Sequence, residues 1–169
     1  MTAPIGRNRA QENKRLHVVM RDGSLIEGMV HVAEDMSLVS FLGSRKGGWV
    51  NMMDARRPKL QEDPRHMIVQ TDLVVIVTAP DANMQAVSQS GAGQGEREVE
   101  MHLVGGKRIK GIMFLATLQR LSDYLTQCGK FAGITRAVLL PDHHELGDIA
   151  VNTSAIATVQ ETKIEPKEE

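Results

Sequence analysis

A tryptophan and four positively charged side chains lie close together in the first half of the chain. Trp49 is flanked by Arg45, Lys46, Arg56 and Arg57. An indole ring can stack on a nucleobase, and arginine and lysine side chains can bind phosphate groups. These five residues are therefore a candidate contact surface for nucleic acid or for another partner. The alternative interpretation is that Trp49 belongs to the apolar core or wall of a small β domain.

Two further groups have the chemistry of a site but not its spacing. His143, His144 and Glu145 are potential metal ligands, yet adjacent side chains point apart in most conformations. A solvated loop is the preferred interpretation. Cys128 is the single cysteine and has no histidine at a readable spacing, so a catalytic thiol is not expected. No catalytic triad or cofactor fingerprint can be recognised, and we expect neither enzymatic activity nor a cofactor.

The elements that carry these residues follow an internal repeat. The segments VQTDLVVIV (69–77) and VNTSAIATV (151–159) are similar and lie 82 residues apart. In the earlier part of each repeat, the two halves align with a shift of 83 residues instead of 82. A single one-residue gap near the middle of the repeat therefore aligns the whole of both halves. Matched pairs include Gly28 with Gly111 and Trp49 with Phe131. This pattern predicts a tandem duplication.

Each repeat begins with a predicted β-hairpin. Apolar residues alternate with polar ones on both sides of the turn RDGS in the first repeat and of the turn VGGK in the second. Such alternation around an Asp-Gly or Gly-Gly turn is typical of two antiparallel strands. Gly28 and Gly111 fall inside the second strand of each hairpin, where glycine indicates a bend or a close backbone approach.

A helical pattern follows each hairpin. Leu118, Leu121, Tyr124 and Leu125 have helical spacing, and Gly129 is a suitable residue to end that helix. The corresponding segment of the first repeat, MSLVSFL with Gly43 after it, is compatible with a short helix or with a strand. We favour the helix because the second repeat shows it more clearly.

The repeats define two domains and a linker. Residues 15–80 and 97–161 are expected to form one unit each, and 81–96 are expected to form a flexible linker because they are rich in Gly, Ser and Gln. The sequence GAGQGE within the linker lacks the Lys-Ser/Thr pair of a phosphate-binding loop.

The segments RDGSLIEGMVHVAEDMSLV and HMIVQTDLVVIV resemble the two-part signature of the Sm and Sm-like family. Asp22, Gly23, Gly28 and Asp35 are the matching positions. The resemblance implies a mainly β fold in which two small SH3-like or Sm-like barrels, each with one short helix, follow one another. It also implies that edge strands pair between units in rings and that RNA binds in the central pore.

The sequence departs from the family at the RNA site. Val39 stands where the family has its base-binding asparagine, and the late Arg-Gly pair is replaced by Gln70-Thr71 and by Asn152-Thr153. We therefore expect a protein-binding adaptor or assembly module of bacterial type, with possible self-association through edge strands. An Sm-like RNA-binding protein is the alternative, and a small-ligand sensor is a third hypothesis without a phosphate-binding motif.

Composition and charge fit a protein partner better than nucleic acid. The net charge is −1, with 11 Lys/Arg against 9 Asp/Glu in residues 1–80 and 9 against 12 in residues 81–169. Neither half has the positive excess typical of nucleic-acid binding. No apolar run reaches the length of a membrane span, and the N-terminus does not have the pattern of a secretory signal. A cytoplasmic location is expected.

Overall fold

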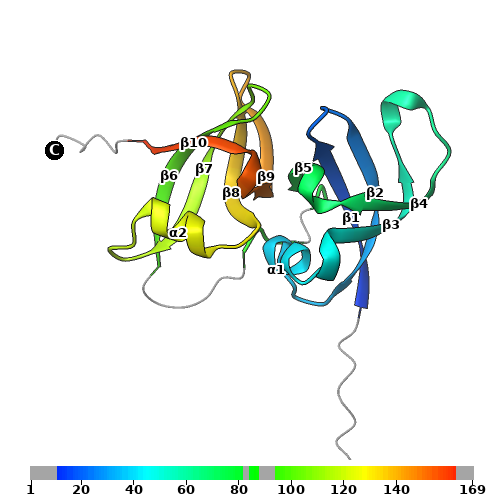
Figure 1. Cartoon of the computed structure of the whole chain (residues 1–169), viewed down its shortest axis with the longest axis horizontal. Coiled ribbons are helices and arrows are strands. Elements are labelled where there is room, and N and C mark those ends of the chain that lie inside the picture. The colour runs from blue at the N-terminus through cyan, green and yellow to red at the C-terminus, as the bar shows by residue number, and fades with distance from the viewer. Residues whose placement is uncertain (1–10, 82–83, 88–93, 163–169) are drawn as a thin grey trace, which may run out of the picture.

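The computed structural model describes residues 11–81, 84–87 and 94–162, and strands dominate it. Figure 1 shows two β-rich halves side by side, with one short helix in each. The mainly β prediction is confirmed. Within the described residues, no helix is long and apolar enough to cross a membrane.

The two halves contain the same order of elements. The first half consists of β1 (Gln11–Met20), β2 (Leu25–Ala33), α1 (Leu38–Gly43), β3 (Trp49–Arg56), β4 (Arg65–Gln70) and β5 (Val74–Thr78). The second half consists of β6 (Gln94–Leu103), β7 (Arg108–Ala116), α2 (Leu121–Gln127), β8 (Phe131–Leu140), β9 (His144–Asn152) and β10 (Ile156–Glu161). A single 3₁₀ turn, Thr71–Leu73 or Thr153–Ala155, precedes the last strand of each half.

All ten strands belong to one antiparallel sheet rather than to two closed barrels. Their order is β10-β6-β7-β8-β9-β5-β1-β2-β3-β4, so the order within each half is the same. The two halves meet where β5 pairs with β9. The expectation of closed barrels is wrong, because β5 and β9 pair with each other across the halves and the two outermost strands have a neighbour on one side only.

Unusual backbone conformations recur at matched positions of the two halves. Positive φ angles occur in five aligned pairs, namely Gly23/Gly106, Asp35/Leu118, Gly47/Gly129, Asp54/Arg136 and Gln61/His143. Three of these pairs include non-glycine residues in both halves, for which a positive φ is uncommon. The halves therefore share local backbone geometry as well as the order of their elements.

The predicted hairpins and helices are present with one local difference. Both hairpins pair through their whole length, and α1 is a helix rather than a strand. The helix in the second half begins at Leu121, and Gly129 follows its C-cap residue Cys128 with a φ of 87°. Leu118 does not belong to the helix as its spacing suggested. It has a φ of 70° and is 93% exposed.

The flexible-linker interpretation of 81–96 does not hold for the described segment 84–87. Met84 belongs to the buried core of the first half, and Ala86 is fully buried. The backbone N–H of Leu38 donates a hydrogen bond of 2.8 Å to a carbonyl of this segment. Because the first amides of a helix have no partner within the helix, this segment supplies acceptors that α1 needs. Strand β6 also begins inside the predicted linker.

Apolar side chains form two buried clusters, and the boundary strands contribute to both. Val74 and Val77 of β5 belong to the first cluster, whereas Val75 and Ile76 belong to the second. Ile26 and Ile109 are 4% and 1% exposed, which confirms the predicted inward phase of both hairpins.

The two matched glycines allow strands to approach closely. A Cβ atom on Gly28 would lie 3.0 Å from the Cβ of Ala55, and one on Gly111 would lie 2.3 Å from Cγ2 of Ile134 and 3.2 Å from the Cα of Ala137. Contacts under 3.0 Å force the neighbouring atoms to move, so Gly111 has less room than Gly28. The mid-strand glycines are therefore explained by packing rather than by a turn.

We predict that Gly111→Ala lowers the free energy of unfolding by about 1–3 kcal/mol, as is typical of an overpacked site. The matched control is Gly95→Ala in β6, where an added Cβ would meet no atom within 4 Å. Urea denaturation followed by circular dichroism measures both. Equal midpoints for the two variants would contradict the close approach of β7 and β8.

Candidate protein-binding surface

The sheet ends in two unpaired edges. Among the described strands, β4 and β10 are the two that have a partner on one side only; Figure 1 shows β4 in the first half and β10 crossing the second half from beside β9 toward the C-terminus. An edge strand presents a row of backbone N–H and C=O groups that can pair with another strand. These two edges are the places where a partner strand can be added to the sheet.

The β4 edge carries two exposed apolar side chains on one face. Trp49 and Ile68 are 50% and 56% exposed. Trp49 is opposite Gln70 and Ile68 is opposite Asn51 in the β3–β4 register. Because opposite residues and every second residue share a face, Trp49 and Ile68 lie diagonally across the same face. We call this pair the β4 face.

The alternative interpretation of Trp49 as a core residue is wrong. The residue aligned with it in the second half, Phe131, is a core residue. Phe131 aligns with Trp49 and is 1% exposed, and Ala150 aligns with Ile68 and is fully buried. Both belong to the core cluster of the first half, although they lie on β8 and β9 of the second half. The neighbouring half covers these residues, whereas in the described structure nothing covers the β4 face.

The β10 edge lies beside a groove. Helix α2 and β10 enclose a cavity of about 420 Å³. Its apolar lining consists mainly of Leu121, Leu125, Ile156 and Val159, which are partly buried. None of the residues of α2 is fully buried, in contrast to α1. We call this cavity the α2–β10 groove.

The basic residues of the predicted cluster do not form one patch with Trp49. Arg56 and Arg57 lie at the other end of β3, roughly 20 Å away at the usual rise per strand residue. Arg56 lies 3.6 Å from Glu27, and Arg57 pairs with Glu62 at 3.0 Å. Their charges are therefore partly neutralised by neighbouring carboxylates.

The other two basic residues of the cluster lie near α1. The guanidinium of Arg45 lies 4.3 Å from the centre of the Phe41 ring, a geometry suited to a cation–π contact. Its Nε is buried and has no hydrogen-bond partner among the described residues. The side chain of Lys46 lies outside the described part of the structure.

The residues that replace the family's RNA-binding pair are used inside the protein. Thr71 is buried, and its hydroxyl donates to the carbonyl of Gly48 (3.0 Å) and accepts from Lys130 Nζ (2.8 Å). Asn152 is also buried, and its amide nitrogen donates to the carbonyls of Thr71 (3.2 Å) and Val74 (2.9 Å). These polar groups already have partners within the chain.

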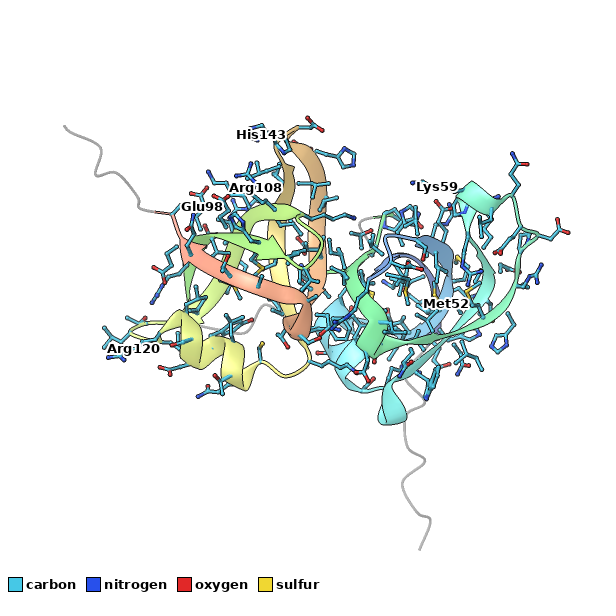
Figure 2. All side chains as sticks on the ribbon, turned by 45° about the horizontal axis from the view of Figure 1, so that its top comes forward. Met52, Lys59, Glu98, Arg108, Arg120 and His143 are labelled. Atoms are coloured by element: carbon cyan, nitrogen blue, oxygen red, sulfur yellow. The ribbon has the colours of Figure 1, made fainter. Side chains whose placement is uncertain are left out.

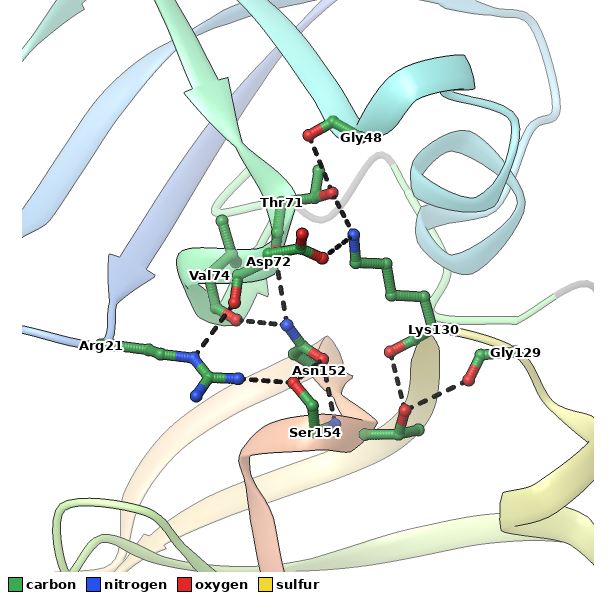
Figure 3. Close-up of polar contacts among 10 residues, drawn as sticks. Arg21, Gly48, Thr71, Asp72, Val74, Gly129, Lys130, Asn152 and Ser154 are labelled. Carbon is green, nitrogen blue, oxygen red and sulfur yellow. Dashed lines mark hydrogen bonds and ion pairs between the residues drawn. The ribbon is translucent and has the colours of Figure 1, made fainter.

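Thr71 and Asn152 belong to a larger polar cluster that joins the two halves (Figure 3). Lys130 forms an ion pair with Asp72. The Arg21 guanidinium donates to the carbonyl of Asp72 (3.1 Å) and to the Ser154 hydroxyl (2.5 Å). We call these six side chains the junction cluster. It ties the loop before β5 to the loop before β10.

Other candidate residues are separate from these surfaces. His143 lies at the tip of the β8–β9 hairpin (Figure 2), and no group of three or more potential metal ligands occurs in the described residues. Burial raises the pKa of the Cys128 thiol, whose sulfur lies 3.5 Å from the carbonyl of Leu125. A raised pKa disfavours the thiolate, which is the nucleophilic form.

Comparison with protein-family models, with curated proteins and with solved structures finds no match for this chain. The site residues are therefore assigned from geometry alone. No local sequence pattern marks Ile68, Lys130 or Arg21, because Lys130 and Arg21 act through contacts with the other half and Ile68 through its place on the sheet edge. One signal was available. The run VVIV of β5 is apolar at every position, which is typical of a strand buried on both faces.

We predict that Asn152→Ala lowers the free energy of unfolding by about 1–3 kcal/mol, because the buried carbonyls of Thr71 and Val74 lose their donor. Asn51→Ala serves as the control, since Asn51 is exposed on β3. Thermal and urea denaturation of both variants measure the difference. If Asn51→Ala lowers the free energy of unfolding as much as Asn152→Ala does, the hydrogen bonds of Asn152 in the junction cluster do not make a special contribution to stability.

Proposed function

We propose that the chain is a non-enzymatic protein-binding adaptor or assembly module that binds partners through the edges of its sheet. The observation that carries the proposal is that both edge strands lie beside apolar surfaces, the β4 face and the α2–β10 groove. Added strands gain affinity from backbone hydrogen bonds and specificity from side-chain contacts. Each edge of this sheet offers both kinds of contact.

We also propose that the two halves arose by duplication of one Sm-like β unit. The shared order of elements, the shared strand order and the five matched pairs of positive φ angles support this proposal. A cytoplasmic location belongs to the same proposal. It is compatible with the single cysteine, because a reducing compartment does not require disulfides.

The pairing of β5 with β9 supports edge binding as a working mode for this chain. Three consecutive pairs, Ile76 with Val151, Val77 with Ala150 and Thr78 with Ile149, join strands from different halves. The contact combines a strand ladder with side chains that enter the neighbouring core. A partner strand added at β4 or β10 would likewise form backbone hydrogen bonds with the edge strand and place side chains against the apolar surface beside it.

We predict that an affinity-tagged full chain recovers specific proteins from a lysate, and that variants with a charged edge lose them. Ile68→Lys places a cation on the β4 edge, and Thr158→Lys places one on the β10 edge; both positions are exposed, so folding is preserved. A lysine on an edge strand opposes strand addition. Quantitative mass spectrometry of the recovered proteins is the measurement.

The matched control for these edge variants is Leu118→Lys, which changes an exposed apolar residue outside both edge strands. Proteins that bind through an edge remain with this control and disappear with one of the edge variants. Recovery of the same proteins with all three variants would reject edge binding as the mode.

We further predict weak and sequence-independent binding to single-stranded RNA. The base-binding positions are replaced, and Arg56 and Arg57 already lie beside carboxylates. Phosphate contacts alone give dissociation constants of about 10⁻⁴ to 10⁻⁶ M. Fluorescence anisotropy with U-rich and A-rich strands in about 150 mM salt tests this. A nanomolar constant that depends on base sequence and is lost in Arg56→Ala/Arg57→Ala would instead support the Sm-like RNA-binding alternative.

A further inference from the structure

The internal junction shows how one half of this protein covers the other. Phe131 and Ala150 of the second half are buried in the first core cluster. The same cluster contains Leu38 and Leu42 of α1 together with Val74 and Val77 of β5. A groove between a helix and the last strand of one half is therefore filled by two side chains from β8 and β9 of the other.

The second half has the same groove, and in the described structure it is uncovered. The four positions that correspond to the helix and strand residues of the first groove are Leu121, Leu125, Ile156 and Val159, and all four line the α2–β10 groove. The two residues that correspond to Phe131 and Ala150 are Trp49 and Ile68, which are half exposed. The chain therefore carries both surfaces of a contact that it makes once internally.

We propose that the partner of these surfaces is a second copy of this chain, bound head to tail, with its β4 beside β10 and its β4 face in the α2–β10 groove. This inference rests on the proposed function and names the partner. Carried over from the β5–β9 pairing, the register places Ile68 beside Val159 and Val69 beside Thr158 of the next chain. Trp49 then takes the place that Phe131 has at the internal junction.

The charges of the two edges are complementary in this register. Beyond Ile68 and Val159, the ladder continues to His66 beside Glu161 and Arg65 beside Thr162, so Arg65 lies next to the acidic end of β10. The Glu161 side chain is 45% exposed and pairs with Arg97 at 2.9 Å.

The contact between chains is weaker than the internal junction. Gly48 and Val104 occupy the positions that correspond to Lys130 and Arg21, so the ion pair and the arginine contacts of the junction cluster have no equivalent. Ala157 and Thr158 replace the buried Val75 and Ile76. Less apolar surface and fewer polar links predict reversible association that depends on protein concentration.

The proposed contact uses two different surfaces, so it is heterologous. Each added chain covers one edge and contributes a new free one. Chains therefore continue to associate until the assembly closes on itself or the concentration limits its growth. Blocking either surface stops this growth, and blocking opposite surfaces on two chains leaves one intact contact between them.

The test uses two full-length variants and their mixture in light scattering coupled to size exclusion. Ile68→Lys blocks β4 and leaves β10 intact, whereas Thr158→Lys blocks β10 and leaves β4 intact. We expect the unmodified chain to show a mass that rises with concentration above the 18.6 kDa of one chain. Each variant alone remains a monomer, and the mixture forms a complex of about twice that mass, because each complex contains one intact contact.

Trp49 provides an independent readout because it is the only tryptophan. Its half-exposed ring becomes covered in the proposed contact, so its emission shifts to shorter wavelength as the concentration rises from about 1 μM to about 1 mM, the range of weak association. Ile68→Lys abolishes this shift, whereas Leu118→Lys retains it. Circular dichroism melting of each variant confirms that the variants are folded.

Three results would overturn the inference. These are a wild-type chain that stays monomeric over the whole range with unshifted emission, a mixture of the two variants that stays monomeric, and an Ile68→Lys variant that associates as the wild type does. If the chain is monomeric but its edge variants still lose captured proteins, the partner is another protein and edge binding stands. If association and edge-dependent capture both fail, the proposed function fails as well.

Discussion

Strand β5 and the last four residues of β9 are buried on both faces, and this constraint organises the rest of the molecule. Val74 and Val77 of β5 pack in the first core, whereas Val75 and Ile76 pack in the second. A strand in this position cannot alternate apolar with polar residues, because either face would bury an unpaired polar group at a cost of a few kcal/mol. Buried polar groups at this boundary gather at the end of β9 and in the adjoining loops, where Asn152 and its neighbours satisfy one another's hydrogen bonds.

The same constraint makes the two ends of the sheet different from its middle. β9 has an alanine, Ala150, where β4 has Ile68, and β5 has Ile76 where β10 has Thr158. Residues that meet inside the chain are small or aliphatic and fully covered, whereas those at the ends combine exposed apolar atoms with polar ones. The ends therefore resemble surfaces that are covered only part of the time, which suits a reversible contact better than a permanent core.

Local patterns predicted the parts of the fold that depend on neighbours in sequence. Alternation and turn residues gave the hairpins, and helical spacing with Gly129 gave α2. The joining of the halves was not predicted, because strand pairing between distant segments leaves little trace in composition. Residues 84–87 illustrate the limit, since a polar, small-residue segment looks like a linker until α1 uses its carbonyls as acceptors. The interpretation of Trp49 as a core residue failed for the same reason. Its alignment with Phe131 does not indicate that Phe131 is covered by the other half of the chain whereas Trp49 is not.

The polar residues of the loops before β5 and β10 already have hydrogen-bond partners within the chain, and this limits where a partner could bind. Thr71 and Asn152 have their hydrogen bonds inside the junction cluster, so a ligand at these loops would have to break contacts that hold the halves together. Backbone groups at the edge strands can bind a partner without breaking contacts between the halves.

Charge then discriminates between possible pairings of the edge strands: β4 begins with Arg65 and His66, and β10 ends with Glu161. Two antiparallel β4 edges run in opposite directions, so Arg65 of each lies toward the Gln70 end of the other and meets no acidic residue of that strand, whereas β4 against β10 brings Arg65 near Glu161. The acidic end of β10 therefore favours pairing of β4 with β10 over pairing of β4 with another β4.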